Sequence, residues 1–212
     1  SSEVEFREAE AWRVGEPGRG VPTIIDMVSQ TRLDCMLGSA GLMRQAVVQA
    51  IHHCRHREAF GARLSEQPLM QNVLADLALE SEAALALTMR MGYSLDNMHD
   101  EQEDKFARLV TAIGKYWICK RTPNHAYEAM ECIGGSGVME DCIMPRLFRE
   151  SPVNAIWEGS GNVQCLDTLR ALQKEPETLD AFFKEAVEAK GADRRFDQFL
   201  AQLRHAVGIK TG

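Results

Sequence analysis

Residues 33–54, LDCMLGSAGLMRQAVVQAIHHC, carry the pattern that decides the fold. Apolar residues recur there at steps of three and four: Leu33, Met36, Leu37, Ala40, Met43, Val47, Ile51 and Cys54. An α-helix turns once every 3.6 residues, so this spacing places those side chains on one face. The stretch therefore predicts a long amphipathic helix, and the helical period begins near residue 21.

Three further segments, 68–95, 106–133 and 163–172, show the same periodicity. Pro123 lies inside the second of them and is expected to kink or divide that helix, because proline cannot donate the backbone hydrogen bond of a helix. Long helices with short connections predict an antiparallel packing. The expected fold class is therefore all-α, an antiparallel four-helix bundle.

The two ends of the chain differ from this bundle. Residues 3–14 alternate weakly between apolar and polar side chains, which predicts a strand, and residues 15–20, GEPGRG, predict a turn. One strand cannot form a sheet of its own, so we interpret residues 1–20 as a remnant of a larger β-structure. Residues 21–172 are assigned to the bundle, and residues 173–212 to an additional helical segment with two short amphipathic helices.

Composition restricts the classes of function. Of the 212 residues, 45% are hydrophobic and 26% charged, and the formal net charge is -7. This charge gives no support for binding to nucleic acid or to an anionic membrane. No apolar run approaches the roughly 20 residues that span a bilayer. The six cysteines include no C-x-x-C pair and are interpreted as reduced, mostly buried thiols, so a cytoplasmic location is expected.

A basic stretch, Arg55–Gly61 (RHREAFG), ends the first predicted helix. Its charge could simply complement the helix dipole, with Gly61 as the stop signal. Alternatively, Arg57 could pair with a phosphate, because a planar guanidinium suits bidentate contact. His52 and His56 lie one helical turn apart but lack the acidic partner of a metal motif, so we interpret them as a surface cluster and predict no metal site.

Two glycine-rich turns follow. Gly134–Gly137 (GGSG) resembles a phosphate-cradling loop, but no predicted strand precedes it and a glycine helix cap explains it equally well.

In Asn154–Asn162 (NAIWEGSGN), Glu158 stands between Trp157 and two glycines, just ahead of a helix. Glu158 could be a first-turn carboxylate favoured by the helix dipole. It could equally be a catalytic base held against the aromatic ring.

Taken in order, these motifs resemble those of the acyl-CoA dehydrogenase family. That family carries an R-x-x-F-G stretch, matched by Arg57–Gly61, and an aromatic-E-G-[ST] segment, matched by Trp157–Ser160. Between them it carries a G-G-x-G turn followed by a proline and an Arg-Asp or Arg-Glu pair, matched by Gly134–Gly137, Pro145 and Arg149-Glu150. Order and spacing agree over residues 3–172.

The segment 154–162 and the stretch Gln67–Met70 (QPLM) are most similar to the alkylation-response branch of this family, an offshoot associated with DNA. The family fold has an N-terminal helical domain, a middle β-domain and a C-terminal four-helix bundle. The resemblance implies that this chain holds the last strand of the middle domain (residues 1–20), the bundle, and a C-terminal extension.

The implied activity is that of an FAD-dependent oxidoreductase of fatty acid metabolism, which introduces an α,β double bond into an acyl-CoA thioester. The implied partners are the acyl-CoA substrate and further copies of the chain, in a homodimer or homotetramer. Because the β-domain walls around the flavin are absent, this chain alone is expected to be inactive and to bind FAD poorly. Acyl chain length cannot be predicted, because the pocket residues are mostly missing.

The resemblance also implies roles for individual residues. Glu158 corresponds to the base that takes the α-proton, and Gly159 would lie beside the substrate. Arg32 matches a family arginine near the substrate. Thr31 occupies the position where some members place the glutamate instead, and threonine cannot serve as that base.

Six residues are implied to bind FAD. Two would contact it within one subunit, Ser160 and Asn162. Four would reach it across a subunit interface: Arg57, Phe60, Gly134 and Gly135. Two departures weaken this match: Glu131 replaces a glutamine that approaches the flavin nucleotide, where a carboxylate would repel pyrophosphate, and Pro68 replaces another glutamine.

The DNA-associated branch supplies an alternative function, in which FAD is mainly structural. From Gln173 onward the chain has seven basic and seven acidic residues. Nonspecific DNA binding needs an excess of cations that face phosphates. The charge of this chain therefore does not support DNA binding.

Overall fold

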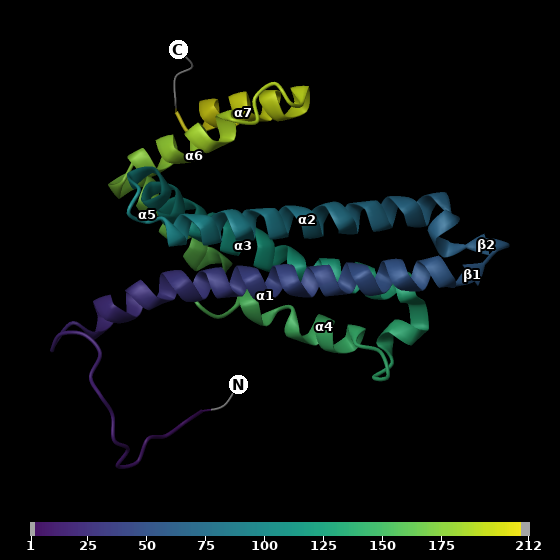
Figure 1. Cartoon of the computed structure of the whole chain (residues 1–212), viewed down its shortest axis with the longest axis horizontal. Coiled ribbons are helices and arrows are strands. Elements are labelled where there is room, and N and C mark those ends of the chain that lie inside the picture. The colour runs from purple at the N-terminus through teal and green to yellow at the C-terminus, as the bar shows by residue number, and fades with distance from the viewer. Residues whose placement is uncertain (1–2, 209–212) are drawn as a thin grey trace.

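Three long helices form the frame of the molecule: α1 (Gly20–His56), α2 (Pro68–Asp96) and α3 (Glu101–Ile133) (Figure 1). The computed structural model describes residues 3–208. Short connections make α1 and α2 antiparallel, and likewise α2 and α3. A fourth helix, α5 (Gly161–Lys174), packs against α3. The all-α bundle expected from the sequence is confirmed.

The helix ends follow local rules. Proline is tolerated at the first helical position, where Pro68 begins α2, because its missing N–H has no partner there. The Asp100 carboxylate caps α3 by accepting hydrogen bonds from the amides of Gln102 and Glu103. At the other end of α3, Gly134 adopts a φ of 71°, a left-handed conformation that stops the helix.

A two-stranded hairpin reverses the chain after α1. Strand β1 (Glu58–Ala59) pairs antiparallel with β2 (Ala62–Arg63). Phe60 and Gly61 form the two-residue turn, with φ of 56° and 80°, as the favoured hairpin turn requires. The 3₁₀ turn η1 (Leu64–Glu66) then leads into α2.

Three short elements bring the chain back from the end of α3 to the start of α5 along the outside of α1 and α3 (Figure 1). They are η2 (Gly134–Val138), α4 (Met144–Glu150) and η3 (Val153–Ala155). Met144 and Leu147 of α4 are buried in the core. This return path determines where Glu158 lies, because η3 ends only three residues before it.

The core is rich in methionine and divides into two clusters along the bundle. Met36, Met43 and Met91 are fully buried in one of them. Burial of each such side chain contributes about 1.5–3 kcal/mol. Gly114 permits close packing of α3 against α1, because a Cβ on that residue would lie 2.7 Å from the Cε of Met36.

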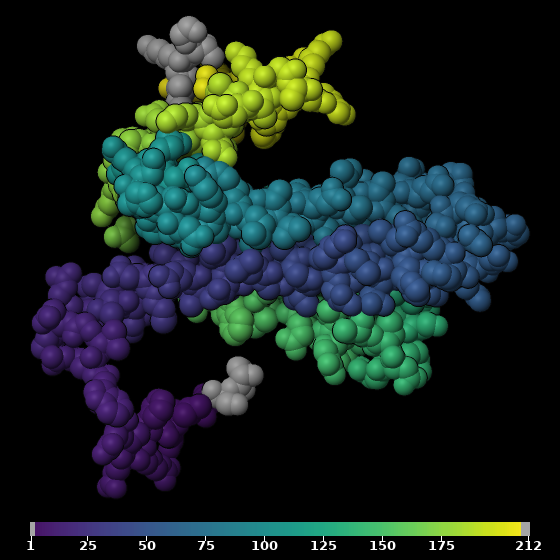
Figure 2. All heavy atoms as spheres, viewed as in Figure 1, coloured from purple at the N-terminus to yellow at the C-terminus, as the bar shows by residue number. Residues whose placement is uncertain are grey.

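The strand expected at residues 3–14 is absent, and one of the two outcomes expected for Pro123 is excluded. Residues 3–19 contain no strand; they extend away from the bundle with Trp12 88% exposed (Figure 2). A strand needs a partner for its backbone N–H and C=O groups, and the described chain offers this segment none. Residues 1 and 2 of the expected remnant lie outside the described residues. Pro123 does not divide its helix, since α3 continues through it to Ile133.

The C-terminal segment contains the two expected short helices, α6 (Glu177–Val187) and α7 (Arg194–Ala206). Ala181 and Phe183 of α6 are buried, and α6 packs against α3. Within the described residues, no helix has both the length and the apolarity needed to cross a membrane.

Arg90 of α2 connects α6 to the bundle. Its guanidinium donates hydrogen bonds to Glu103 of α3 at 2.7 and 3.1 Å, and to Glu185 of α6 at 2.7 and 2.9 Å. It also lies 4.4 Å from the centre of the Phe106 ring. One cation therefore joins three helices.

Replacing this cation tests its contribution. We expect Arg90→Met to lower the free energy of unfolding by about 1–3 kcal/mol, because two partly buried carboxylates lose their partner. The matched control is Arg121→Met, which removes a more exposed pair with Glu80 and should cost less than about 1 kcal/mol. Urea denaturation measures both variants, and equal losses would contradict the assigned role.

Candidate active site

The predicted site residues fall into two groups. One lies at the start of α5 and beside α1: Arg32, Glu158, Gly159, Ser160 and Asn162. The other lies at the hairpin and the end of α3: Arg57, Phe60, Gly134 and Gly135. Residues 32 and 57 are 25 steps apart along α1, which is about 37 Å at a rise of 1.5 Å per residue. The two groups therefore lie at opposite ends of the bundle.

The backbone at Glu158 adopts an uncommon conformation. Glu158 has a φ of 55°, and Gly159 follows with a φ of 95°. A left-handed conformation is open to glycine but costs a residue such as glutamate roughly 1–3 kcal/mol, so the surroundings must hold it. Glu158 is half-buried.

Three side chains hold this turn through its carbonyl groups. Lys115 Nζ, from α3, donates to the carbonyl oxygens of Trp157 at 2.5 Å and Gly159 at 2.6 Å. Gln164 Nε2, from α5, donates to the carbonyl oxygens of Glu158 at 3.1 Å and Gly159 at 2.9 Å. Arg32 Nε, from α1, donates to the carbonyl oxygen of Glu158 at 3.2 Å. We call Arg32, Lys115 and Gln164 the carbonyl clamp.

Two members of the carbonyl clamp are almost completely buried. Lys115 and Gln164 are each 1% exposed. Burial lowers the pKa of Lys115, because a charged ammonium loses its hydration inside the bundle. A neutral amine still has two N–H groups, one for each of the two carbonyl oxygens that Nζ contacts. The clamp therefore does not depend on the charge of Lys115.

A second set of contacts fixes the aromatic ring beside Glu158. Trp157 Nε1 donates to Asn154 Oδ1 at 3.0 Å, and Asn154 Nδ2 donates to Ser39 Oγ of α1 at 3.2 Å. Burial raises the pKa of the Cys35 thiol, and the negative charge of Glu158 contributes to that rise. The contacts through Asn154 and Ser39 thus connect the Trp157 ring to α1.

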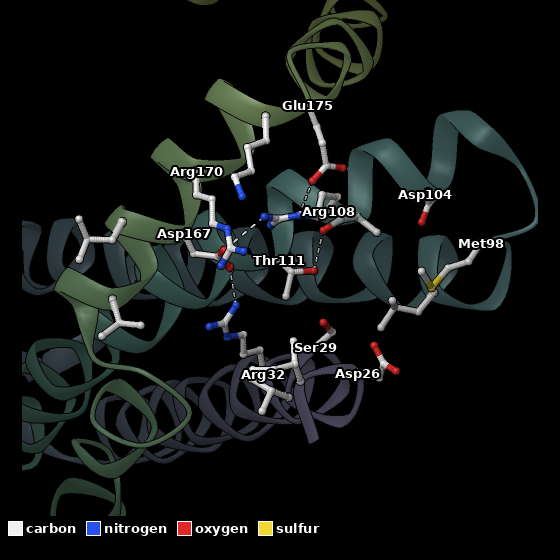
Figure 3. A pocket seen from close by; sticks show the side chains of 17 residues that line it. Asp26, Ser29, Arg32, Met98, Asp104, Arg108, Thr111, Asp167, Arg170 and Glu175 are labelled. Carbon is white, nitrogen blue, oxygen red and sulfur yellow. Dashed lines mark hydrogen bonds and ion pairs between the residues drawn. The ribbon is translucent and has the colours of Figure 1, made fainter. Parts of the chain in front are cut away.

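Arg32 has a second partner in a groove of about 600 Å³ between α1, α3 and α5 (Figure 3). Its Nη1 donates to Asp167 Oδ2 at 2.6 Å, and Arg108 also contacts Asp167, at 3.3 Å. Arg32 is thus tied to the turn on one side and to α5 on the other. The Thr31 hydroxyl donates to the carbonyl of Val28 within the same helix.

The second group offers an exposed cation, an exposed ring and an open glycine turn. Arg57 is exposed, Phe60 is 96% exposed, and a Cβ on Gly134 or Gly135 would meet nothing within 4 Å. The buried Cys54 thiol lies 3.8 Å from the carbonyl oxygen of Cys132, which places the ends of α1 and α3 side by side. Such a surface fits a ligand with anionic and aromatic parts.

Both departures from the family pattern, Glu131 and Pro68, lie at this end of the bundle. Glu131 Oε1 accepts a hydrogen bond from the Tyr127 hydroxyl at 3.0 Å, which engages its carboxylate along α3. Gln67, just before Pro68, donates from Nε2 to the carbonyl of Ala59 at 3.3 Å and so ties α2 to the hairpin. In the described chain, no group of three histidine, cysteine or acidic side chains could hold a metal ion.

A family model, the acyl-CoA dehydrogenase C-terminal domain, matches residues 18–173. The chain belongs to the acyl-CoA dehydrogenase family. The resemblance stated from the motifs is confirmed, and the match covers the whole bundle together with both groups of site residues.

Individual relatives agree with this membership. The putative acyl-CoA dehydrogenase AidB of Escherichia coli K12 is 46% identical over 204 residues, which cover 96% of this chain and 38% of that protein. Acyl-CoA dehydrogenase family member 11 of Caenorhabditis elegans is 32% identical, over 98% of this chain and 34% of that protein. The chain thus spans little more than a third of these relatives.

A solved structure extends the likeness to the fold. The crystal structure of Caenorhabditis elegans ACDH-11 in complex with C11-CoA superposes with a TM-score of 0.80 at 31% sequence identity. The alignment covers 92% of this chain and 33% of that one. The bundle and most of its C-terminal extension therefore have a counterpart in another family member.

Sequence reasoning missed Lys115, Gln164 and Asp167, because none lies in a recognised motif. One signal was present for Lys115: it is four residues from Thr111 and three from Ile118, both buried, so a lysine occupies the buried stripe of α3. A charged residue in such a register indicates a buried polar contact.

Gly159 gives a direct test of the turn geometry in this family member. A Cβ at Gly159 would lie 2.8 Å from Val163 Cγ1 and 2.9 Å from Gln164 Nε2, in a backbone conformation that side chains disfavour. We expect Gly159→Ala to lower the free energy of unfolding by about 1–3 kcal/mol. Gly41→Ala, which adds a methyl group to α1 in open space, should be neutral or stabilising by up to about 1 kcal/mol. Comparable destabilisation of the two variants in thermal unfolding would argue against a strained turn.

Proposed function

We propose that this chain is the C-terminal domain of an FAD-dependent acyl-CoA dehydrogenase-like oxidoreductase, in which Glu158 takes the α-proton of an acyl-CoA thioester. The observation that carries the proposal is the left-handed Glu158, held by the carbonyl clamp from three helices. A backbone strain that costs free energy persists where the surrounding structure enforces it, and such positions cluster at active sites.

The chemistry of the proposed step is undemanding, but its geometry is strict. The α-hydrogen of a thioester is weakly acidic, so a carboxylate can remove it only when held close to the α-carbon. The half-buried Glu158 on a turn with fixed carbonyl groups supports this role. In this proposal Gly159 lies beside the substrate, where the lack of a side chain leaves room, and Arg32 fixes the backbone of the base.

The acyl-CoA substrate class is supported by the family match and by the printed description of the ACDH-11 structure, a complex with C11-CoA. Bound FAD would supply the acceptor for the hydride that leaves the β-carbon. Ser160 and Asn162, both exposed at the start of α5, would contact the flavin nucleotide beside Glu158.

The second group of residues would hold the remainder of an FAD molecule. Arg57 suits the pyrophosphate, Phe60 suits a stacked adenine, and Gly134 and Gly135 allow close backbone approach. Because about 37 Å of helix separates them from Glu158, one chain does not bring both groups to one dinucleotide. We therefore propose a homodimer or homotetramer in which each FAD contacts two subunits.

The alternative, a DNA-associated flavoprotein with structural FAD, gains little from the C-terminal segment. Arg195 is paired with Asp193 at 2.9 Å, and the Arg204 guanidinium lies 5.1 Å from the centre of the Phe183 ring. Both cations thus have partners within the chain, and the segment as a whole has equal numbers of basic and acidic residues. We retain the enzymatic proposal.

Substitution of the proposed base tests this function in the FAD-loaded protein that carries this chain. We expect Glu158→Gln to slow anaerobic flavin bleaching by acyl-CoA about 10²- to 10⁴-fold, because the amide cannot accept the α-proton. The clamp contacts only the backbone of residue 158, so FAD content should not change. Stopped-flow absorbance gives the rate, with exposed Glu150→Gln as control. An unchanged bleaching rate would remove Glu158 from this role.

Titration of the 212-residue chain with FAD tests whether the two separated groups of residues suffice to bind the cofactor. We expect weak binding, with a dissociation constant above about 10 μM, because the chain spans little more than a third of its relatives and separates its two groups of contacts. Flavin fluorescence measures the affinity. Tight stoichiometric binding would show that the described surfaces suffice without further domains.

A further inference from the structure

We propose that Lys115 is a positioning residue for Glu158, which it orients by holding the carbonyl groups on either side of it. This inference rests on the proposed function of Glu158 as a base. The two hydrogen bonds, to Trp157 and Gly159, bracket residue 158 in the chain. Lys115 holds the peptide group before Glu158 through the Trp157 carbonyl, and Arg32 and Gln164 hold the peptide group after it through the Glu158 carbonyl. Because peptide groups are planar, fixing both also fixes the direction of the Cα–Cβ bond of Glu158, and the contact of Lys115 with the Gly159 carbonyl holds the next peptide group along the chain.

Lys115 connects the turn to the middle of the helix bundle. It lies in the middle of α3, which packs against α1, α2, α5 and α6. The hydrogen bonds of Nζ span 42 and 44 residues of sequence. Gln164 lies only five and six residues beyond the carbonyl groups that it contacts, so it moves with the turn. Lys115 therefore anchors the turn to the bundle.

A lysine at this position is not explained by packing alone. The side chain is 1% exposed, and burial of its ammonium group opposes folding. An apolar side chain of similar length would fill the same space without that cost. Both hydrogen bonds of Nζ end on the Glu158 turn, so the turn is what the amine serves.

The other polar groups around Lys115 do not replace it. Cys35 and Arg32 face it from α1, Cys119 from α3, and Glu158 from the turn. Arg32 reaches the carbonyl of Glu158 but is also paired with Asp167. Neither thiol donates to the turn: the Cys119 thiol donates to the carbonyl of Cys35. Loss of the amine would thus leave the Trp157 carbonyl without its donor.

The test compares Lys115→Met with wild type in the FAD-loaded protein. Methionine keeps the length of the apolar stem of lysine, up to the ε position, and its helix propensity, but removes the amine and with it both hydrogen bonds. We expect FAD content and acyl-CoA affinity to stay within about twofold, whereas flavin reduction slows about 10- to 100-fold, as a small misplacement of a catalytic group does. Amide hydrogen exchange in peptides covering residues 153–162 should accelerate about tenfold.

Exposed Lys184→Met of α6 is the matched control and should change neither rate nor exchange. Unchanged exchange in 153–162 for Lys115→Met would overturn the inference. The inference would also be overturned if Lys115→Met accelerated the exchange but reduced flavin at the normal rate, provided that Glu158→Gln is inactive. If Glu158→Gln itself reduces flavin normally, it is the proposed base that fails.

A second variant covers the case in which Lys115→Met yields no holoprotein. Lys115→Gln keeps an N–H donor but is one bond shorter, so it cannot hold both carbonyl groups. We expect partial rescue: exchange in 153–162 about threefold faster than in wild type, and flavin reduction slowed less than in the methionine variant. Wild-type exchange in the glutamine variant would overturn the inference.

Discussion

A turn that directs consecutive carbonyl groups into a helix bundle must find hydrogen-bond donors there. The middle of an α-helix offers none from its backbone, because every N–H already bonds the carbonyl four residues earlier. The donors at Trp157, Glu158 and Gly159 therefore come from side chains, one each from α1, α3 and α5. The left-handed conformation of Glu158 and the burial of Lys115 both follow from this requirement.

The same contacts explain why the fourth helix is placed where it is. Gln164 holds the turn from within α5, and Asp167, one turn later, pairs with Arg32 of α1. Arg108 of α3 completes the link by contacting Asp167 and Glu175. The first turns of α5 are thus attached to two long helices through charged side chains, while much of its apolar surface, such as Leu166, remains exposed.

The length of α1 has a functional consequence of its own. A helix of 37 residues carries Arg32 near its start and delivers the chain to Arg57 and Phe60 at its end. The substrate-side residue Arg32 and the proposed FAD contacts Arg57 and Phe60 are therefore far apart within the chain. Under the proposed function, self-association is the means by which a rigid bundle completes each site.

By itself, the sequence determined the helices and the family, and it identified Glu158 as a candidate base. The period of residues 33–54 and the order of the motifs are local properties, so they survive without knowledge of contacts. Long-range pairing is not local, which is why a strand was wrongly predicted at residues 3–14. For the same reason the sequence did not show that α3 continues through Pro123. Only the tertiary structure decided that Lys115 and Arg32, 42 and 126 residues from their carbonyl partners, converge on one turn. That convergence depends on how buried polar groups are satisfied across helices, and periodicity carries no information about it.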